Sequence, residues 1–168
     1  REFLTLMGVA GAGLGLSVCA PVFAPTPAQP IASISDANAI TNSVLIADDE
    51  RMMVDCLMSI IQEEFKEVSV LSASDGVEAL QQMERHSSSL LILDLMMPRK
   101  TGFEVLKELS RRGCQCPVLV ISACARSKEE VVKRAELEGE RIEFLSKPFG
   151  IEELLSIVQN LMNRSKAS

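Results

Sequence analysis

The stretch LLILDLMMPRKTG, residues 90–102, contains the pattern that decides the fold. Its first four residues are all apolar, and so short a run is typical of a strand that is buried on both faces. Asp94 ends this run, and Pro98 and Gly102 mark a loop and the start of a helix. Open α/β sheets place their functional groups at the carboxyl ends of such strands. Asp94 is therefore a candidate functional residue, although a single aspartate there more often only caps a turn.

Short apolar runs alternate with helical patterns on both sides of this stretch. Strands are predicted at 43–47, 68–71, 90–93, 118–121 and 142–145. Helices are predicted at about 52–65, 103–113, 127–139 and 151–162, and a further helix begins at 74–76. In the first helix Met52, Met53 and Cys56 recur at helical spacing and are expected to face the core. The alternation predicts a doubly wound α/β fold, with a five-stranded parallel sheet and helices on both faces.

The composition limits the classes of partner. The net charge is −6, and basic residues are interspersed with acids, so no basic stripe is available for a phosphate backbone. The absence of Trp and Tyr removes the side chains that favour single-stranded nucleic acid. The five cysteines lack paired CxxC spacing, and the single histidine, His86, lies in a polar stretch, so a zinc site is not expected. No nucleic-acid partner is predicted.

The first 42 residues differ from the rest of the chain. Residues 3–35 carry no charge, and residues 3–20 contain no proline and approach the shortest length that spans a bilayer. This segment is similar to an export signal of the twin-arginine type, although only one arginine, Arg1, is present. Residues 21–42 are rich in Pro, Ala and Ser, as is typical of a linker. The sequence thus predicts a signal-like or anchor-like leader with a linker at 1–42, and one folded domain at 43–168.

Polar residues follow four of the five predicted strands. They are Asp48 and Asp49 after the first strand, Asp94 after the third, Ser122 after the fourth and Lys147 after the fifth. Because the carboxyl ends of parallel strands meet at one edge of a sheet, we expect these side chains to lie close together. Carboxylates a few ångströms apart repel by about 4 kcal/mol per pair at an effective dielectric of about 20, so cations must offset them.

Mg²⁺ and Lys147 are the expected cations. Mg²⁺ prefers oxygen ligands and is commonly held by one or two carboxylates together with a phosphoryl oxygen. Once these cations offset the negative charge of the carboxylates, Asp94 can act as a nucleophile toward a phosphoryl group. The oxygens of that group would contact Lys147 and the Ser122 hydroxyl. The alternative is a purely structural network of buried ion pairs, which is seldom energetically favourable.

These motifs resemble those of the receiver domains of two-component response regulators. The matching motifs are Asp48-Asp49, Asp94-x-x-Met97-Pro98-x-x-x-Gly102, Ser122-Ala123 and Lys147-Pro148-Phe149, over residues 43 to about 164. The resemblance implies that Asp94 is the phospho-acceptor and that Lys147 and Ser122 assist it. It also implies that Asp49, Asp94 and the Met96 backbone carbonyl bind Mg²⁺ with help from Asp48. Phe144 stands where the family has an aromatic switch residue, often Tyr, and the bond before Pro148 is expected to be cis.

The sequence therefore predicts a stand-alone phospho-acceptor receiver without turnover of a separate substrate. A histidine kinase or a histidine phosphotransfer protein is the expected phosphodonor, and a downstream protein is expected to bind the face of the fourth helix, fifth strand and fifth helix. One alternative is an adaptor of the same fold that is never phosphorylated. Another is a flavodoxin-like nucleotide or flavin enzyme, but Asp48-Asp49-Glu50 occupy the place of its phosphate loop. The receiver is predicted to be cytoplasmic, in conflict with the export-like leader.

Overall fold

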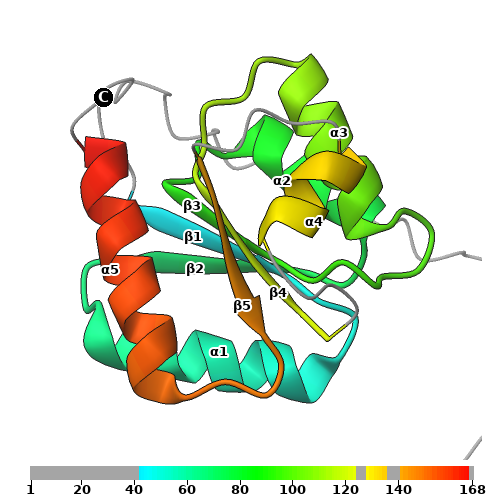
Figure 1. The fold of residues 1–168 in the computed structure, drawn as a ribbon. Helices are drawn as coiled ribbons and strands as arrows, with labels where there is room; N and C mark the ends of the chain where they lie inside the picture. Colours follow the sequence, from blue (N-terminus) through cyan, green and yellow to red (C-terminus); the bar gives the residue numbers. More distant parts are fainter. Residues whose placement is uncertain (1–41, 124–127, 136–140, 167–168) are drawn as a thin grey trace, which may run out of the picture. The chain divides into compact units, whose positions relative to one another are not determined.

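The computed structural model describes residues 42–123, 128–135 and 141–166, in which strands and helices alternate (Figure 1). The elements are β1 (Ser43–Ala47), α1 (Arg51–Glu64), β2 (Ser69–Ala73), α2 (Gly76–Arg85), β3 (Leu90–Leu93), α3 (Gly102–Arg111), β4 (Val118–Ser122), α4 (Lys128–Ala135), β5 (Ile142–Ser146) and α5 (Ile151–Lys166). The predicted alternation of five strands and five helices is confirmed.

All five strands are parallel and form one sheet in the order β2-β1-β3-β4-β5. The strand that ends at Asp94, β3, is therefore the central one, with β1 and β4 as its neighbours. Because the strands are parallel, their carboxyl ends meet at one edge of the sheet. This edge is where the candidate residues follow their strands, and we call it the carboxyl edge.

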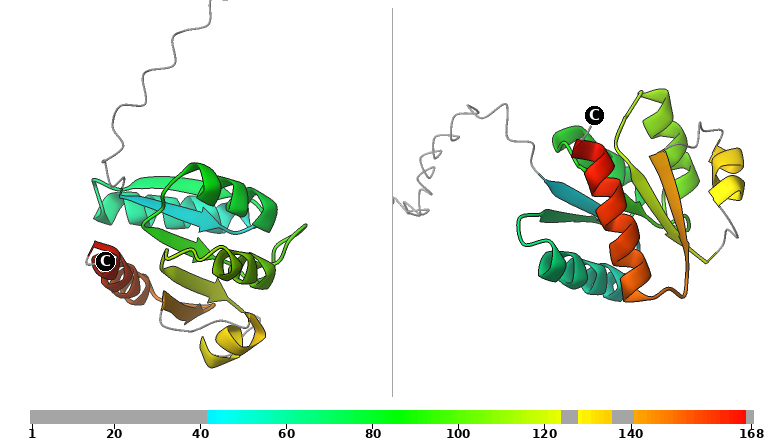
Figure 2. Two further views of the ribbon diagram at one scale, coloured as in Figure 1. Left: turned by 90° about the horizontal axis from the view of Figure 1, so that it is seen from above. Right: turned by 60° about the vertical axis from the view of Figure 1, so that its left-hand side comes forward.

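Helices cover both faces of the sheet (Figure 2). One apolar cluster joins the sheet to α1 and α5, and a second joins the opposite face to α2, α3 and α4. Every residue of β1, β3 and β4 is buried, whereas the edge strands β2 and β5 are partly exposed. A strand covered on both faces needs apolar side chains on both, which explains the uninterrupted apolar run at 90–93.

The structure corrects some details of the sequence-based prediction. Met52 is 81% exposed and Cys56 is exposed, so the expectation that they face the core is wrong. The buried side of α1 consists of Val54, Leu57 and Ile61, a narrower stripe than predicted, because only one side of the helix contacts the sheet. Strand β2 extends to Ala73 and helix α5 to Lys166, both beyond their predicted ends.

Other predictions fall on residues outside the described ranges. They include the leader, almost all of the linker, the Ser127 end of the fourth helix and the stretch toward Gly139. Within the described ranges, none of the helices combines the length and apolar character needed to cross a membrane.

Candidate functional site

The two buried aspartates of the candidate site follow neighbouring strands. Asp48 comes directly after β1 and Asp94 directly after β3. The Asp94 amide donates a hydrogen bond to the Ala47 carbonyl at 2.8 Å, so the β1–β3 pairing continues to Asp94 itself. The parallel register of two buried strands thus places both carboxylates at the carboxyl edge, as the sequence predicted.

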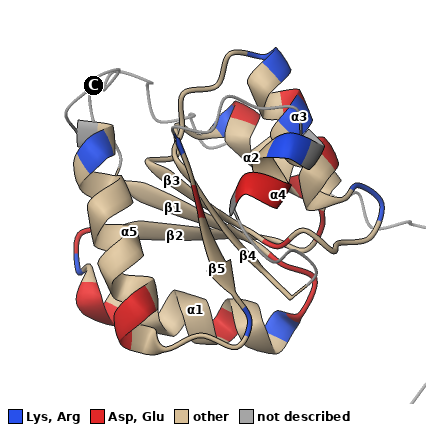
Figure 3. Cartoon of the chain, viewed as in Figure 1, with Lys and Arg blue, Asp and Glu red and all other residues tan. Residues whose placement is uncertain are grey.

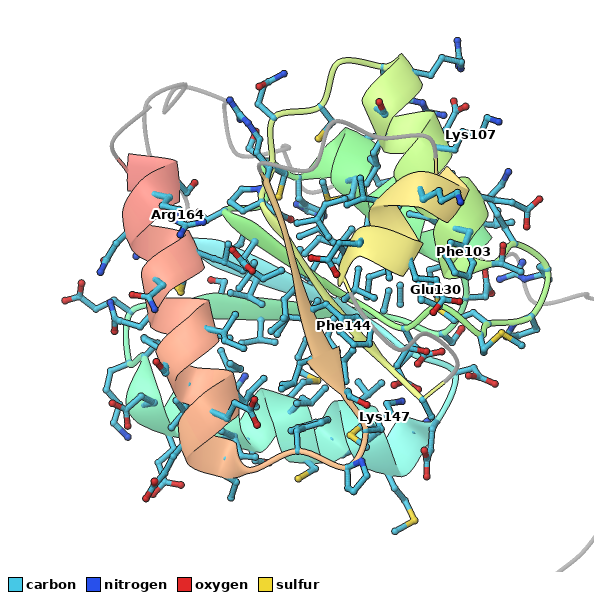
Figure 4. All side chains as sticks on the ribbon, in the orientation of Figure 1. Phe103, Lys107, Glu130, Phe144, Lys147 and Arg164 are labelled. Carbon is cyan, nitrogen blue, oxygen red and sulfur yellow. The ribbon has the colours of Figure 1, made fainter. Side chains whose placement is uncertain are left out.

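Lys147 joins these two carboxylates. Its Nζ lies 2.8 Å from Asp48 Oδ2 and 3.2 Å from Asp94 Oδ1. Lys147 follows the end of β5, as Figure 4 shows, and its backbone amide donates to the Ser122 carbonyl at 3.2 Å. The Lys147–Pro148 bond is cis, as the family resemblance implied. Residues at the carboxyl ends of β1, β3, β4 and β5 are therefore joined through Lys147.

The two carboxylates are almost completely buried. The side chains of Asp48 and Asp94 are only 5% and 7% exposed. Their other oxygens accept backbone hydrogen bonds, Asp48 Oδ1 from the Glu50 amide at 2.8 Å and Asp94 Oδ2 from the Met96 amide at 2.6 Å. Burial lowers the pKa of the Lys147 ammonium, but the two carboxylates outweigh this effect and the pKa is raised. Lys147 is therefore positively charged at neutral pH.

The donor set suits a hard divalent cation. The side chains of Asp48, Asp49, Asp94 and Lys147 together carry a formal charge of −2. Figure 3 shows acidic and basic residues in the loops at this end of the sheet. All the available ligands are oxygens, which Mg²⁺ prefers. In the part of the chain that the structure describes, no group of three or more His, Cys, Asp or Glu side chains lies close enough to hold a metal ion by itself. Mg²⁺ does not need such a group, because it commonly uses one or two carboxylates and completes its coordination with water or phosphate.

The other predicted residues lie at or near this edge but differ in burial. Asp49 and Met96 are exposed, whereas Ser122 is almost completely buried at the end of β4. Phe144 lies on β5 beside Val120 of β4, and its side chain packs against the cluster formed with α2, α3 and α4. Phe144 is thus one strand away from Ser122 and takes no part in the ion pairs around Lys147.

Two features of the site were not predicted from the sequence. A Cβ atom on Gly102 would lie 2.2 Å from the carbonyl oxygen of Asp94, so the start of α3 packs directly on the backbone of Asp94. Arg99, in the same loop, forms an ion pair with the buried Asp75 before α2. The spacing from Asp94 to Gly102 carries a signal for the first contact. Nothing local in the sequence indicates the second, because its partners lie on different loops.

Comparisons with known proteins match most of the residues that the structure describes. The sequence profile described as response regulator receiver domain matches residues 44–159. The response regulator MprA of Mycobacterium leprae (strain TN) is 38% identical over 123 residues, covering 73% of this chain and 52% of that protein. The chain therefore spans about half the length of the curated relatives it matches.

Solved structures resemble the chain over the same region. The receiver domain of the Francisella response regulator 1452 is 31% identical, with a TM-score of 0.62 and coverage of 74% of this chain and 98% of that one. The response regulator TrrA from Thermotoga maritima, solved in complex with Mg²⁺-BeF, is 26% identical, with a TM-score of 0.61 and coverage of 71% and 98%. With the profile match and the shared fold, the chain belongs to the receiver domain family of two-component response regulators.

Proposed function

We propose that this receiver accepts a phosphoryl group on Asp94 with Mg²⁺ and thereby switches a protein-binding face. The observation that carries the proposal is the Lys147 ammonium between the buried carboxylates of Asp48 and Asp94, at 2.8 and 3.2 Å. A purely structural ion network does not need an excess of carboxylates, whereas a phosphoryl-transfer site does, because those carboxylates recruit a divalent cation.

The transfer step follows from the placement of the side chains. A carboxylate oxygen of Asp94 attacks the phosphorus of a phosphohistidine, the phosphorus–nitrogen bond breaks, and the imidazole leaves with the electron pair and takes a proton from water. The product is an acyl phosphate on Asp94. Lys147 and the Ser122 hydroxyl would contact its oxygens. Asp48, Asp49, Asp94 and the Met96 carbonyl would hold Mg²⁺, which supplies positive charge to the phosphoryl oxygens, as the Mg²⁺-BeF complex of the Thermotoga relative supports.

The surface around the acceptor supports a protein phosphodonor. Met52, Met96 and Ile151 are large apolar residues that are exposed, and each belongs to a segment at the carboxyl edge. Exposed apolar side chains around a polar site are typical of a protein interface. A histidine kinase or a histidine phosphotransfer protein is the proposed donor. The proposed output face is formed by α4, β5 and α5 around Phe144.

The wider setting of the domain stays a prediction. We propose that the receiver acts in the cytoplasm, where kinases obtain ATP, and that it turns over no separate substrate; recovery only outside the cytoplasm after cell fractionation would oppose this location. The relatives are about twice as long as the matched region. The expectations of a stand-alone receiver and of no nucleic-acid partner therefore apply to the given sequence alone.

The direct test is phosphorylation by a small phosphodonor. The chain is incubated with acetyl phosphate with and without Mg²⁺, and the intact mass and the modified peptide are measured. We expect the mass of one phosphoryl group, located on Asp94, only when Mg²⁺ is present. Asp94→Asn should abolish the gain because the amide is not nucleophilic.

The matched control is Asp55→Asn, which changes an exposed aspartate on α1 that pairs only with Arg51. This variant should gain mass like the parent. Absence of any phosphorylation of the parent would favour the adaptor that is never phosphorylated. A phosphoryl group mapped to another residue would show that Asp94 is not the acceptor.

A further inference from the structure

The loop between β3 and α3 carries both Asp94 and Met96, and the start of α2 holds this loop from the side. Asp75, the residue before α2, has a side chain that is only 4% exposed. Its Oδ1 accepts hydrogen bonds from the amides of Val77 at 2.8 Å and Glu78 at 3.0 Å. Its Oδ2 pairs with the Arg99 guanidinium of the loop. Both oxygens of this buried carboxylate are thus used, one within α2 and one toward the site.

The backbone of Arg99 shows that its position is constrained. Its φ is +62°, in the left-handed region that residues with a Cβ seldom adopt. Within the described ranges it is the only residue other than glycine with positive φ. Such a conformation persists when surrounding contacts over-determine it, and the ion pair to Asp75 is such a contact.

A second contact holds the same part of the loop. A Cβ on Gly76, the first residue of α2, would lie 2.2 Å from the carbonyl oxygen of Lys100. The loop backbone therefore packs directly on the first turn of α2. This contact is independent of the Asp75–Arg99 pair, and both place residues 99–100 against the same helix terminus.

These contacts reach the acceptor through the loop itself. The Gly102 amide donates to the Leu95 carbonyl at 3.0 Å and closes the base of the loop. The Met96 amide donates to Asp94 Oδ2 at 2.6 Å. Met96 lies between the closed base and the anchored Arg99, so both ends limit where its backbone can lie.

We propose that Asp75 and Arg99 are positioning residues, which hold the loop so that Asp94 and the Met96 carbonyl face the same cation. The inference rests on the proposed function. An ion pair outside a metal site that orients its ligands commonly changes metal affinity by about 10- to 100-fold. The pair connects α2, which has no residue in the site, to the phosphoryl-transfer reaction.

The test uses two variants that spare the local structure. Arg99→Gly removes the guanidinium and suits the positive φ. Asp75→Asn keeps an acceptor for the cap of α2 but removes the charge that faces Arg99. For each variant, urea unfolding is measured, and then the Mg²⁺ concentration that gives half of the maximal rate of phosphorylation by acetyl phosphate. We expect this concentration to rise about tenfold in either variant. The double variant should show no further rise, because both changes break one pair.

Amide hydrogen exchange of the metal-free protein, followed by NMR, tests the inference without phosphorylation. The amides of Met96 and Gly102 should exchange faster in both variants than in the parent. Arg85→Ala is the control, because Arg85 is exposed and lies at the opposite end of α2 from Asp75. It should change neither the Mg²⁺ requirement nor the exchange of these amides. Unchanged amide exchange in both variants overturns the positioning role. If the parent is phosphorylated, an unchanged Mg²⁺ requirement in both variants overturns it as well. A parent that is not phosphorylated overturns the proposed function instead, and the exchange measurement then decides the positioning role alone.

Discussion

The backbone around Asp94 leaves no room for a side chain at Gly102. A methyl group there would lie 2.2 Å from the Asp94 carbonyl oxygen and 2.8 Å from the Leu95 Cα. Both are backbone atoms, which cannot swing aside as a side chain can. We expect Gly102→Ala to lower the free energy of unfolding by about 1–3 kcal/mol, the usual cost of overpacking, in urea denaturation.

Gly150 provides the control for this change. It precedes α5, and a Cβ there would meet no atom within 4 Å. Gly150→Ala should therefore change the free energy of unfolding by at most about 0.5 kcal/mol. Equal urea midpoints for the two variants would show that the start of α3 has room to move away from Asp94.

At the scale of the element, α3 depends on the cap at its first turn. The Thr101 hydroxyl accepts from the Glu104 amide at 3.4 Å, and the Glu104 carboxylate accepts from the Thr101 amide at 2.9 Å and its hydroxyl at 2.8 Å. Thr101→Ala removes the two hydrogen bonds made by the hydroxyl. We expect it to lower the free energy of unfolding by about 1 kcal/mol. Ser59→Ala, on the exposed side of α1, is the control and should change it by less than about 0.5 kcal/mol.

The cap also predicts a dependence on pH. Hydrogen bonds from the Thr101 amide and hydroxyl lower the pKa of the Glu104 carboxyl in the folded protein. A lowered folded pKa stabilises the fold above the unfolded pKa, and this stabilisation is lost as the pH falls through the folded value. The difference between Thr101→Ala and the parent should therefore shrink as the pH falls below about 4. A difference that stays constant from pH 7 to about pH 3 would contradict the role of the ionised carboxylate.

At the scale of the whole molecule, the proposed switch couples the acceptor to a distant face. Ser122 ends β4, and Phe144 lies beside Val120 on the neighbouring strand β5. We expect movement of Ser122 toward the phosphoryl group to let Phe144 turn inward, which shifts the population of an existing second state. Loaded with Mg²⁺ and beryllofluoride, the parent should show NMR shift changes around Phe144 that Ser122→Ala lacks.

The control for the switch is Ser72→Ala. Ser72 is an exposed strand serine on β2, at the opposite edge of the sheet from β5. This variant should respond to beryllofluoride like the parent. If Ser122→Ala is fully loaded and still shows the parent's shifts around Phe144, the hydroxyl is not the coupling element.

The amino-acid sequence is enough to predict the order of the strands and helices and the positions of the site residues along the chain. Four apolar residues before Asp94 encode a buried strand, and acids or a lysine directly after such runs must meet at the carboxyl edge once the strands are parallel. These properties depend on residues that are close in sequence, where periodicity and turn chemistry act. Strand and helix ends also depend on contacts with distant residues, and β2 and α5 both extend beyond their predicted ends.

Only the tertiary structure decided which side of each helix faces the sheet and which distant groups meet. Met52 and Leu57 both fit the apolar pattern of α1, but the contact of the helix with the sheet buries Leu57 and leaves Met52 exposed. Lys147 meets Asp48 across 99 residues, and Arg99 meets Asp75 from a different loop. Such contacts depend on how strands and helices pack in three dimensions, and local sequence periodicity carries no record of that packing.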